Sequence, residues 1–298
     1  MDSRSNSAGR VLVTGSRGFT GRYVCEELAA AGYDVIPTAM TSSPDSIVLD
    51  IASPEACRDV IEAHQPDYIV HLAAISFVAH AQTEAFYRVN AIGTSNLLQA
   101  CHDVGHIPKK ILVASSANVY GNTAGGELFE DQRIQPVNHY GASKAAMEYM
   151  AATWFDKLPL IITRPFNYTG RGQALQFLVP KIVDHFRQRQ PRIELGNLDV
   201  MRDFSDVRTV AHAYRALLEG SATAEVVHIC SGVPYALRDV VSTLEKLAGY
   251  EIEITVNPAF VRANEVKVLV GSPEKLSRLV PGLVRPTFEE TLRWMYEE

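Results

Sequence analysis

Short apolar runs alternate with longer amphipathic stretches along the first half of the chain. The short runs are rich in aliphatic residues, as in strands buried on both faces, whereas the longer stretches repeat apolar residues at helical spacing. The predicted strands are Val11–Thr14, Asp34–Pro37, Ser46–Leu49, Tyr68–Leu72, Lys110–Ser115 and Leu160–Arg164. The predicted helices are Gly21–Ala31, Pro54–His64, Thr83–Asp103 and Tyr140–Phe155. Such alternation predicts an α/β fold with a doubly wound parallel sheet.

The alternation loosens after Pro165, where a loop precedes shorter, more scattered elements. The pattern there predicts helices over Gln176–Gln188, Leu237–Ala248 and Phe288–Tyr296, and a strand over Arg192–Leu195. We therefore expect a smaller C-terminal α/β lobe that binds the substrate. The predicted large domain comprises residues 9–168, with residues 199–226 returning to it, and the predicted smaller domain comprises residues 169–198 and 227–298.

The stretch Arg10–Gly21 joins the first predicted strand to the first predicted helix through a glycine-rich turn. Gly15 permits a backbone conformation that a Cβ would obstruct, Gly18 lets the main chain approach a pyrophosphate, and Gly21 lets the helix pack closely on the strand. The N–H groups at the start of that helix would face the phosphates. Glycines also occur in ordinary turns, but a strand before and a helix after predict a dinucleotide site in a Rossmann domain. The contacts predicted in this turn are Gly15, Arg17, Gly18, Phe19, Thr20 and Gly21.

The residues after the second predicted strand bear on the choice between NADP and NAD. An NAD site usually has an acidic residue there for the ribose 2′-hydroxyl, and the segment 37–42 (PTAMTS) has none. Arg17 could instead bind a 2′-phosphate through a bidentate contact. The competing interpretation is that Arg17 is a solvated loop residue and Asp45 binds the ribose. We predict NADP, with NAD as the alternative.

Further contacts are predicted at the ends of the third and fourth strands, because ligands of open α/β sheets bind beyond the carboxyl ends. Asp50 and its neighbour Ile51 could flank the adenine ring, although Asp50 could equally begin the turn before the next helix. Ser76 follows the fourth strand within reach of a substrate. We interpret His71 as a hydrogen-bonded histidine at the strand end and not as a ligand. The small residues that would lie along the cofactor are Leu72, Ala73 and Ala74.

Composition and charge limit the class of protein. With 298 residues, 47% hydrophobic and 21% charged, the chain is typical of a globular protein with a large core. A formal net charge of −6 argues against nucleic acid or an acidic membrane surface as a partner. The N-terminal residues lack the apolar core of a signal peptide, and no apolar run is long enough to span a membrane.

The cysteines Cys25, Cys57, Cys101 and Cys230 are widely spaced and include no C-x-x-C pair. This spacing favours buried free thiols in a reducing compartment over disulfides or a metal site. We therefore expect a cytoplasmic protein that binds no metal.

A Tyr-x-x-x-Lys pair on a predicted helix provides candidate chemistry. Tyr140 and Lys144 are four residues apart, so both would project from one helix face. A phenol with a pKa near ~10 is a poor acid or base at neutral pH, and a neighbouring ammonium is expected to lower that pKa. Ser115 and Ser116 follow the fifth predicted strand. Such serines usually begin a turn, but beside Tyr140 one of them could bind a substrate oxygen.

Several motifs occur in an order that resembles one known family. They are T-G-x-x-G-F-x-G, D-I, H-L-A-A, N-x-x-G-T-x-N-L-L from Asn90 to Leu98, S-S-x-x-V-Y-G and Y-x-x-x-K. Together they resemble the extended short-chain dehydrogenase/reductase family, whose members act on nucleotide sugars. The resemblance implies that Ser116, Tyr140 and Lys144 form a catalytic triad. It further implies that Lys144 and Tyr140 lie at the nicotinamide ribose and that Asn90 lies near Lys144.

The second half of the chain resembles the members of this family that act on GDP-sugars. The segment Arg164–Tyr168 resembles one in which an asparagine, here Asn167, touches the substrate phosphate, and Arg171 stands where proline is usual. The segments Gly196–Phe204 and 262–266 resemble two others, although Ala263 replaces a proline in the second.

Three cations in this half are candidate partners of the substrate diphosphate by their charge, namely Lys181, Arg202 and Arg262. The competing interpretation is that they form surface ion pairs with Asp184, Asp203 and Glu265. The complete set of predicted substrate contacts is Ser76, Ser116, Asn118, Asn167, Lys181, Arg202, Arg262 and Glu265.

Asn118 separates the activities that this resemblance allows. The 4,6-dehydratases carry a glutamate at that position and the GDP-fucose synthases a cysteine, whereas an amide does not ionise near neutral pH. What remains is a hydride transfer at C4 assisted by Tyr140. The resemblance therefore implies an NADP-preferring 4-ketoreductase that converts GDP-4-keto-6-deoxymannose to GDP-rhamnose or GDP-6-deoxytalose.

Two other functions fit the same motifs. One is a UDP-sugar 4-epimerase that keeps a tightly bound NAD, and the other is a dinucleotide-sensing regulator on the same fold. The intact Ser116, Tyr140 and Lys144 argue against the regulator, because a sensor does not need them. The resemblance also implies a homodimer formed through the helices near residues 83–103 and 140–155.

Overall fold

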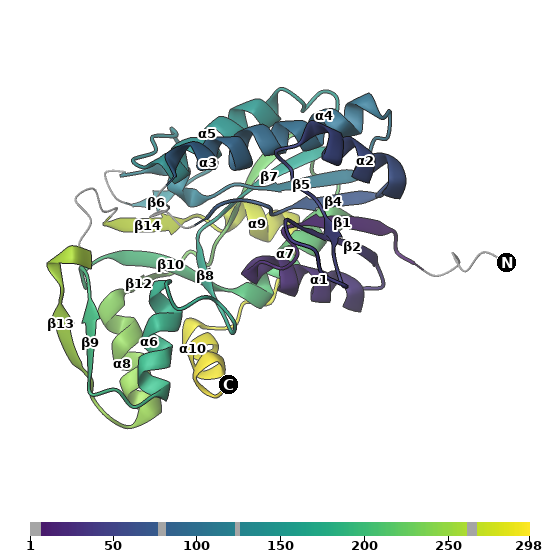
Figure 1. The fold of residues 1–298 in the computed structure, drawn as a ribbon. Helices are drawn as coiled ribbons and strands as arrows, with labels where there is room; N and C mark the ends of the chain where they lie inside the picture. Colours follow the sequence, from purple (N-terminus) through teal and green to yellow (C-terminus); the bar gives the residue numbers. More distant parts are fainter. Residues whose placement is uncertain (1–6, 77–81, 123–125, 261–266) are drawn as a thin grey trace.

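The computed structural model describes residues 7–76, 82–122, 126–260 and 267–298. A large parallel sheet is covered by helices on both faces, and a smaller sheet with its own group of helices lies beside it (Figure 1). The α/β fold and the parallel sheet predicted from the sequence are thereby confirmed. Within the described part of the chain, none of the helices has the length and apolar content needed to cross a lipid bilayer.

The large sheet contains seven strands in the order β11-β7-β5-β4-β1-β2-β3, and every neighbouring pair is parallel. Its strands are β1 (Arg10–Thr14), β2 (Asp34–Ala39), β3 (Ile47–Val48), β4 (Tyr68–His71), β5 (Lys110–Ala114), β7 (Leu160–Pro165) and β11 (Glu225–Ile229). The direction of strand succession reverses between β1 and β4. In doubly wound sheets this reversal opens a crevice at the carboxyl ends, where ligands bind.

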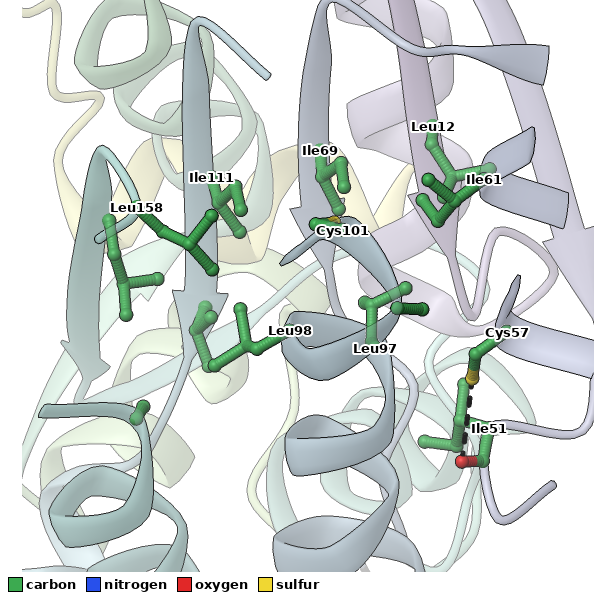
Figure 2. Packing of buried hydrophobic residues seen from close by; sticks show 14 of the residues in the cluster. Leu12, Ile51, Cys57, Ile61, Ile69, Leu97, Leu98, Cys101, Ile111 and Leu158 are labelled. Atoms are coloured by element: carbon green, nitrogen blue, oxygen red, sulfur yellow. Dashed lines mark hydrogen bonds between the residues drawn. The ribbon is translucent and has the colours of Figure 1, made fainter. Parts of the chain in front are cut away.

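Helices cover both faces of this sheet. One face is covered by α2 (Pro54–His64), α4 (Thr94–Asp103) and α5 (His139–Ala152), and the other by α1 (Phe19–Ala30), α7 (Val207–Glu219) and α9 (Glu274–Leu279). Figure 2 shows the first interface, where Leu12, Ile69 and Ile111 of the strands meet Ile61 of α2 and Leu97 of α4. All five side chains are fully buried, and each contributes about 1.5–3 kcal/mol by leaving water.

The smaller sheet follows the order β12-β10-β14-β6, with β8 paired to β10 outside that path. Its strands are β6 (Glu127–Leu128), β8 (Asn167–Thr169), β10 (Met201–Asp206), β12 (Pro234–Ala236) and β14 (Val268–Gly271). A two-stranded sheet of β9 (Arg192–Leu195) and β13 (Glu253–Val256) packs with α6 (Leu178–Arg187), α8 (Leu237–Ala248) and α10 (Phe288–Tyr296). These helices share a separate core of buried apolar side chains.

Most predicted elements occur within a few residues of their predicted bounds, and two differences matter. The predicted helix over Thr83–Asp103 is divided into α3 (Thr83–Phe86), the π-helical segment η1 (Tyr87–Gly93) and α4. In addition, β10 belongs to the smaller sheet, and the predicted domain boundary at residue 226 falls inside β11 of the large sheet. The reason is that β11 pairs with β7 along its whole length. The division into two domains otherwise stays a prediction.

Candidate active site

The glycine-rich turn lies at the end of β1, beside the point where strand succession reverses. Gly15 has a φ of +69°, and a Cβ on it would lie 2.9 Å from the backbone nitrogen of Ala73. A Cβ on Gly21 would lie 2.2 Å from the carbonyl oxygen of Gly15. The end of β1, the start of α1 and the loop after β4 therefore approach one another more closely than a side chain at Gly15 or Gly21 would allow. The turn leads directly into α1, whose first residues have no side-chain cap. Those free N–H groups fit a pyrophosphate.

A buried row of hydrogen bonds fixes this edge of the sheet. The Thr14 hydroxyl accepts hydrogen bonds from the N–H groups of Leu72 and Ala73, so its own proton is directed to His71 Nδ1, 2.7 Å away. His71 Nε2 lies 2.9 Å from the Thr94 hydroxyl, which donates to the carbonyl of Asn90. Burial and the charge of Lys144 lower the pKa of His71 to about 3. His71 is thus a neutral, hydrogen-bonded strand-end histidine, as predicted.

Arg17 extends from the glycine turn to the end of β2. Its Nη1 lies 3.3 Å from the Thr41 hydroxyl, and the side chain is exposed to solvent. This position is where the adenosine ribose lies in dinucleotide-binding sheets. Asp45, the alternative ribose partner, is also exposed, in a bend where its own N–H faces Ser43 Oγ at 3.5 Å. The contact places Arg17 at the end of β2, and its role in binding a 2′-phosphate stays a prediction.

The other predicted cofactor contacts lie along the same edge. Asp50 is exposed and accepts a hydrogen bond from the N–H of Ala52, so it does form the turn before α2. Ile51 is buried, and its side chain packs on Gly93 so closely that a Cβ there would lie 2.8 Å away. Ser76 is exposed at the end of a described segment. The residues Leu72, Ala73 and Ala74 follow β4 and are half-buried beside the glycine turn.

The predicted triad is brought together from two elements. Ser116 is the N-cap of the short 3₁₀ helix η2 (Ala117–Tyr120) that follows β5, whereas Tyr140 and Lys144 lie in the first half of α5. All three side chains are buried, and a hydrogen bond joins Ser116 to the Tyr140 phenol. Lys144 Nζ donates to the carbonyl of Ala114 at 2.7 Å. An ammonium has three donors, so it retains the capacity to hold ribose hydroxyls.

The pKa shifts of the triad differ from the sequence-based expectation. Burial raises the pKa of Tyr140 to about 12, the nearby Tyr168 phenol acts in the same direction, and the hydrogen bond to Ser116 opposes it. Burial also lowers the pKa of Lys144 to about 8, which Glu148 opposes. The expected lowering of the phenol pKa by Lys144 is therefore wrong for this structure, because burial dominates. At neutral pH the phenol carries its proton and can act as an acid.

Asn90 connects the catalytic helix to the loop after β4. It is fully buried in η1, where its amide exchanges two hydrogen bonds with the backbone of Ile75 and donates a third to Ser143 Oγ at 3.0 Å. Ser143 in turn donates to the carbonyl of Tyr140. Asn90 thus contacts Ser143, the residue before Lys144. Through Ser143 it supports the backbone of α5 that carries Tyr140 and Lys144.

Asn118 orients the serine hydroxyl. Its side-chain Nδ2 and its backbone N–H both donate to Ser116 Oγ, at 3.1 and 3.2 Å. With two donors on its oxygen, Ser116 directs its own proton to the Tyr140 phenol, and in catalysis it could turn that proton toward a developing oxyanion. An amide at this position cannot transfer a proton, so the arrangement supports hydride chemistry and not elimination.

Asn167 lies at the start of β8 and presents a buried amide nitrogen that lacks a hydrogen-bond partner among the described residues. An unpaired buried donor is costly unless a ligand satisfies it, and a phosphate oxygen would do so. The next residue, Tyr168, hydrogen-bonds Thr20 at 2.7 Å and stacks on Phe19, so β8 reaches the cofactor turn. The unpaired amide of Asn167 and the position of β8 beside the cofactor turn are both consistent with the prediction that Asn167 binds substrate phosphate.

Two of the three candidate cations lie on different elements, Lys181 on α6 and Arg202 on β10. Lys181 donates to the carbonyl of Glu194 and lies 4.7 Å above the Phe260 ring. Arg202 donates to the carbonyl of Met201, whereas the carboxylate of Asp203 turns inward to Ser231. The proposed ion pairs of Lys181 with Asp184 and of Arg202 with Asp203 are therefore not formed. Two further predicted substrate contacts, Arg262 and Glu265, lie outside the described residues.

Arg171 occupies the position where proline is usual in the resembling segment. Its guanidinium lies over the Trp294 ring at 5.0 Å and donates to the Trp294 carbonyl, while its own carbonyl accepts from Tyr23 of α1. The residue therefore ties its loop to α1 and α10.

Sequence reasoning missed the buried residues that support the site. Thr14, Thr94 and Ser143 make the hydrogen bonds described above. Thr14 and Thr94 belong to the quoted motifs T-G-x-x-G-F-x-G and N-x-x-G-T-x-N-L-L but carry no predicted role, and Ser143 has no signal beyond a hydroxyl in a predicted helix. Glu148 did have a signal, because it follows Lys144 by four residues on the same helix face.

The comparisons with known proteins agree with this geometry. Residues 11–230 match the model of the NAD dependent epimerase/dehydratase family. Among curated relatives, GDP-6-deoxy-D-talose 4-dehydrogenase of Aggregatibacter actinomycetemcomitans is 34% identical over 90% of both chains. GDP-6-deoxy-D-mannose reductase of Pseudomonas aeruginosa is 32% identical over 95% of both chains.

Solved structures show the same fold over nearly the full length. A structure from Burkholderia cenocepacia, provisionally described as an epimerase, is 46% identical over 98% of both chains with a TM-score of 0.92. The structure of RMD from Pseudomonas aeruginosa complexed with NADPH is 29% identical, covers 97% of this chain and 98% of that chain, and has a TM-score of 0.86.

Proposed function

The chain belongs to the NAD dependent epimerase/dehydratase family, and from this premise we propose that it is a 4-ketoreductase of GDP-4-keto-6-deoxymannose. Its enzyme class is that of an NAD(P)-dependent nucleotide-sugar oxidoreductase. The relatives named for GDP-6-deoxy-sugars support a GDP-sugar substrate and oxidation or reduction at C4. The predicted products are GDP-rhamnose or GDP-6-deoxytalose.

The observation that carries this proposal is the pairing of Asn118 with Ser116 beside a protonated Tyr140. When bound, a reduced nicotinamide dinucleotide supplies the hydride for such a reduction. Tyr140 then donates its proton to the C4 oxygen, while Ser116 hydrogen-bonds that oxygen as negative charge develops on it. Lys144 holds the ribose hydroxyls and supplies positive charge near the resulting phenolate.

The glycine turn and Arg17 support NADPH as the preferred cofactor, with NADH as the weaker one. The glycines let β1, α1 and the loop after β4 pack closely together, which is the geometry of a dinucleotide-binding turn. A structural neighbour was solved with NADPH, whereas the family as a whole is described as NAD dependent. Both cofactors are therefore compatible, and Arg17 would set the preference.

The test is turnover of purified protein on a small panel of 4-keto nucleotide sugars. We expect NADPH to be consumed with the GDP-linked substrate and much more slowly with UDP- or dTDP-linked ones. GDP-mannose alone should give no 4-keto sugar. GDP should also raise the thermal midpoint of unfolding more than UDP or dTDP, because a ligand that binds only the folded state stabilises it.

Two variants make this test specific. Arg202→Ala should lose most of the protection by GDP, whereas Tyr140→Phe should keep it, because only the former changes a proposed diphosphate contact. Stronger protection by UDP would contradict the GDP assignment. A cofactor that survives purification without exchange would favour the UDP-sugar 4-epimerase as the second candidate, in line with the provisional description of the Burkholderia structure.

We also propose a cytoplasmic homodimer formed through η1, α4 and α5. Ile92 on η1 and Tyr149 on α5 leave 49% and 66% of their surface exposed, and these elements pack side by side. All four cysteines are free thiols, which fits a reducing compartment. Sedimentation of the wild type should give a dimer and Tyr149→Glu a monomer; a wild-type monomer at micromolar concentration would contradict the proposal.

A further inference from the structure

A buried arginine lies behind the candidate triad and contacts both elements that carry it. Arg164, near the end of β7, is 4% exposed. Its Nε and Nη2 donate to both carboxylate oxygens of Glu148, at 2.7 to 3.1 Å. Its Nη1 donates to the Tyr120 hydroxyl at 2.6 Å and to the carbonyl of Glu130 at 2.9 Å. These bonds engage four of the five N–H donors of the guanidinium.

The two partners of Arg164 belong to the segments that hold the triad. Glu148 lies on α5, one helical turn after Lys144 and two after Tyr140. Tyr120 ends η2, the short helix that Ser116 caps. A planar guanidinium presents its donors in a fixed fork, so it sets the separation between its two partners. Through that fork, β7 fixes η2 relative to α5.

Glu148 also acts electrostatically on the buried ammonium of Lys144, four residues earlier on the same helix face. Lys144 lies between its own helix and the sheet, where β5 supplies the Ala114 carbonyl and β4 supplies His71. His71 is neutral because burial lowers its pKa to about 3, so it adds no second positive charge beside Lys144. Burial lowers the pKa of Lys144, and the Glu148 carboxylate opposes that shift. The order of charges is therefore cation, anion, cation from Lys144 through Glu148 to Arg164.

We propose that Glu148 and Arg164 are positioning residues of the Ser116, Tyr140 and Lys144 triad. Glu148 supplies the negative charge that keeps the buried Lys144 ammonium charged, and Arg164 holds Glu148 in place while it anchors the Ser116 turn through Tyr120. A purely structural ion pair would add little net stability, because desolvation offsets most of the attraction between buried charges. This inference rests on the proposed function only in taking the triad to be catalytic.

The first experiment measures the titration of Lys144 in the protein alone. Protein labelled with ¹³C at the lysine ε-carbon is titrated by NMR, and the Lys144 resonance is assigned by its absence in Lys144→Arg. Glu148→Gln should move the Lys144 midpoint to lower pH by at least about one unit, the usual size for losing a nearby opposite charge. Glu148→Asp keeps the charge and should restore most of the wild-type midpoint. Glu219→Gln, which alters an exposed pair with Arg215, is the matched control and should change nothing.

The second experiment separates charge from geometry through activity. In Glu148→Gln the high-pH limb of the kcat/KM profile should move to lower pH together with the Lys144 midpoint. Arg164→Lys keeps a cation but cannot contact Glu148 and Tyr120 through one planar fork, so kcat should fall at least ~10-fold with the Lys144 midpoint retained. Arg164→Lys also tests the proposal if Glu148→Gln does not fold.

Identical Lys144 midpoints in the wild type and Glu148→Gln would overturn the role of Glu148. Full kcat in Arg164→Lys would overturn the role of Arg164. The NMR titration needs no substrate. A failure of the positioning proposal can therefore be told apart from a failure of the proposed function. If no GDP-sugar is reduced but the midpoint moves as expected, only the substrate assignment is wrong.

Discussion

Burial makes the Tyr140 phenol hold its proton more strongly than a phenol in water does. A phenolate removed from water loses its solvation, and the hydrogen bond to Ser116 offsets only part of that loss, so the pKa rises to about 12. The sequence showed that Tyr140 and Lys144 share a helix face, but it could not show how deeply both are buried. The raised pKa keeps the phenol protonated at the start of a reduction, and the positive charge of Lys144 would stabilise the phenolate that remains after proton transfer.

Replacing Tyr140 with Phe removes this acid and leaves the cofactor turn unchanged. We expect kcat to fall by at least ~10²-fold, the usual contribution of a positioned acid or base, with NADPH affinity within about twofold of wild type. Steady-state kinetics and a fluorescence titration of NADPH measure the two quantities. Tyr33→Phe removes a phenol that contacts Glu219, far along the chain from the triad, and serves as the control. Near wild-type turnover in Tyr140→Phe would show that the triad assignment is wrong.

Arg17 is the residue through which the chain would select NADPH. Arg17→Glu replaces a donor to the 2′-phosphate with a repelling carboxylate, and one charge-assisted hydrogen bond is worth roughly 1.5–3 kcal/mol. The ratio of kcat/KM for NADPH to that for NADH should therefore fall at least ~10-fold. Arg22→Glu makes the same charge change on α1, where the side chain contacts the carbonyl of Gly172, and should leave the ratio unchanged. An equal loss for both cofactors would mean that Arg17 does not contact the 2′-phosphate.

At the scale of elements, the divided helix shows what periodicity cannot resolve. The apolar pattern over residues 83–103 predicts one helix, and the structure inserts the π-helical turn η1 within it. A π-helical turn adds a residue to the repeat and rotates the side chains that follow. Asn90 lies in that turn and contacts Ile75 and Ser143. A hydrophobic period averaged over several helical turns does not reveal a single π-helical turn.

The junction of β1 and α1 makes a sharp prediction at the same scale. Gly21→Ala would place a Cβ 2.2 Å from the Gly15 carbonyl and 2.7 Å from Ser16 Cα, so either the turn or the helix must move. We expect a loss of about 1–3 kcal/mol in the free energy of unfolding, together with weaker NADPH binding. Gly220→Ala, whose Cβ would lie 3.4 Å from its nearest neighbour, is the control and should be tolerated. Urea unfolding measures the free energy of unfolding, and a titration measures NADPH affinity. If Gly21→Ala keeps the wild-type value of both quantities, the turn is not as closely packed as described.

For the whole molecule, local sequence patterns predicted the sheet better than the connections between its parts. Several elements have the bounds that the sequence predicted, among them α2, β9, α8 and α10, because each combines a clear period with clear end signals. The sequence could not assign β10 and β11, since a short strand does not reveal which sheet it joins. The buried pair of Glu148 and Arg164 is likewise a product of tertiary structure, because its members come from different elements.

The two fully buried histidines make the stability of the molecule depend on pH. Burial lowers the pKa of His71 and of His228 to about 3, and the neighbouring cations Lys144 and Arg164 act in the same direction. Between about pH 3 and 6.5 the unfolded chain binds a proton at each position and the folded chain does not. The free energy of unfolding must therefore fall as the pH drops below about 6.5.

At pH 5 the loss should amount to about 2 kcal/mol for each histidine relative to pH 7. Urea unfolding followed at pH 7 and pH 5 measures it, and neither substrate nor cofactor is needed. His71→Gln should remove about half of the difference, because only His228 then remains to be protonated on unfolding. His102→Gln alters a half-exposed histidine on α4 and should leave the difference unchanged. If the wild type is equally stable at both pH values, the two buried imidazoles are protonated in the folded protein, and the directed hydrogen bond from Thr14 to His71 cannot exist as described.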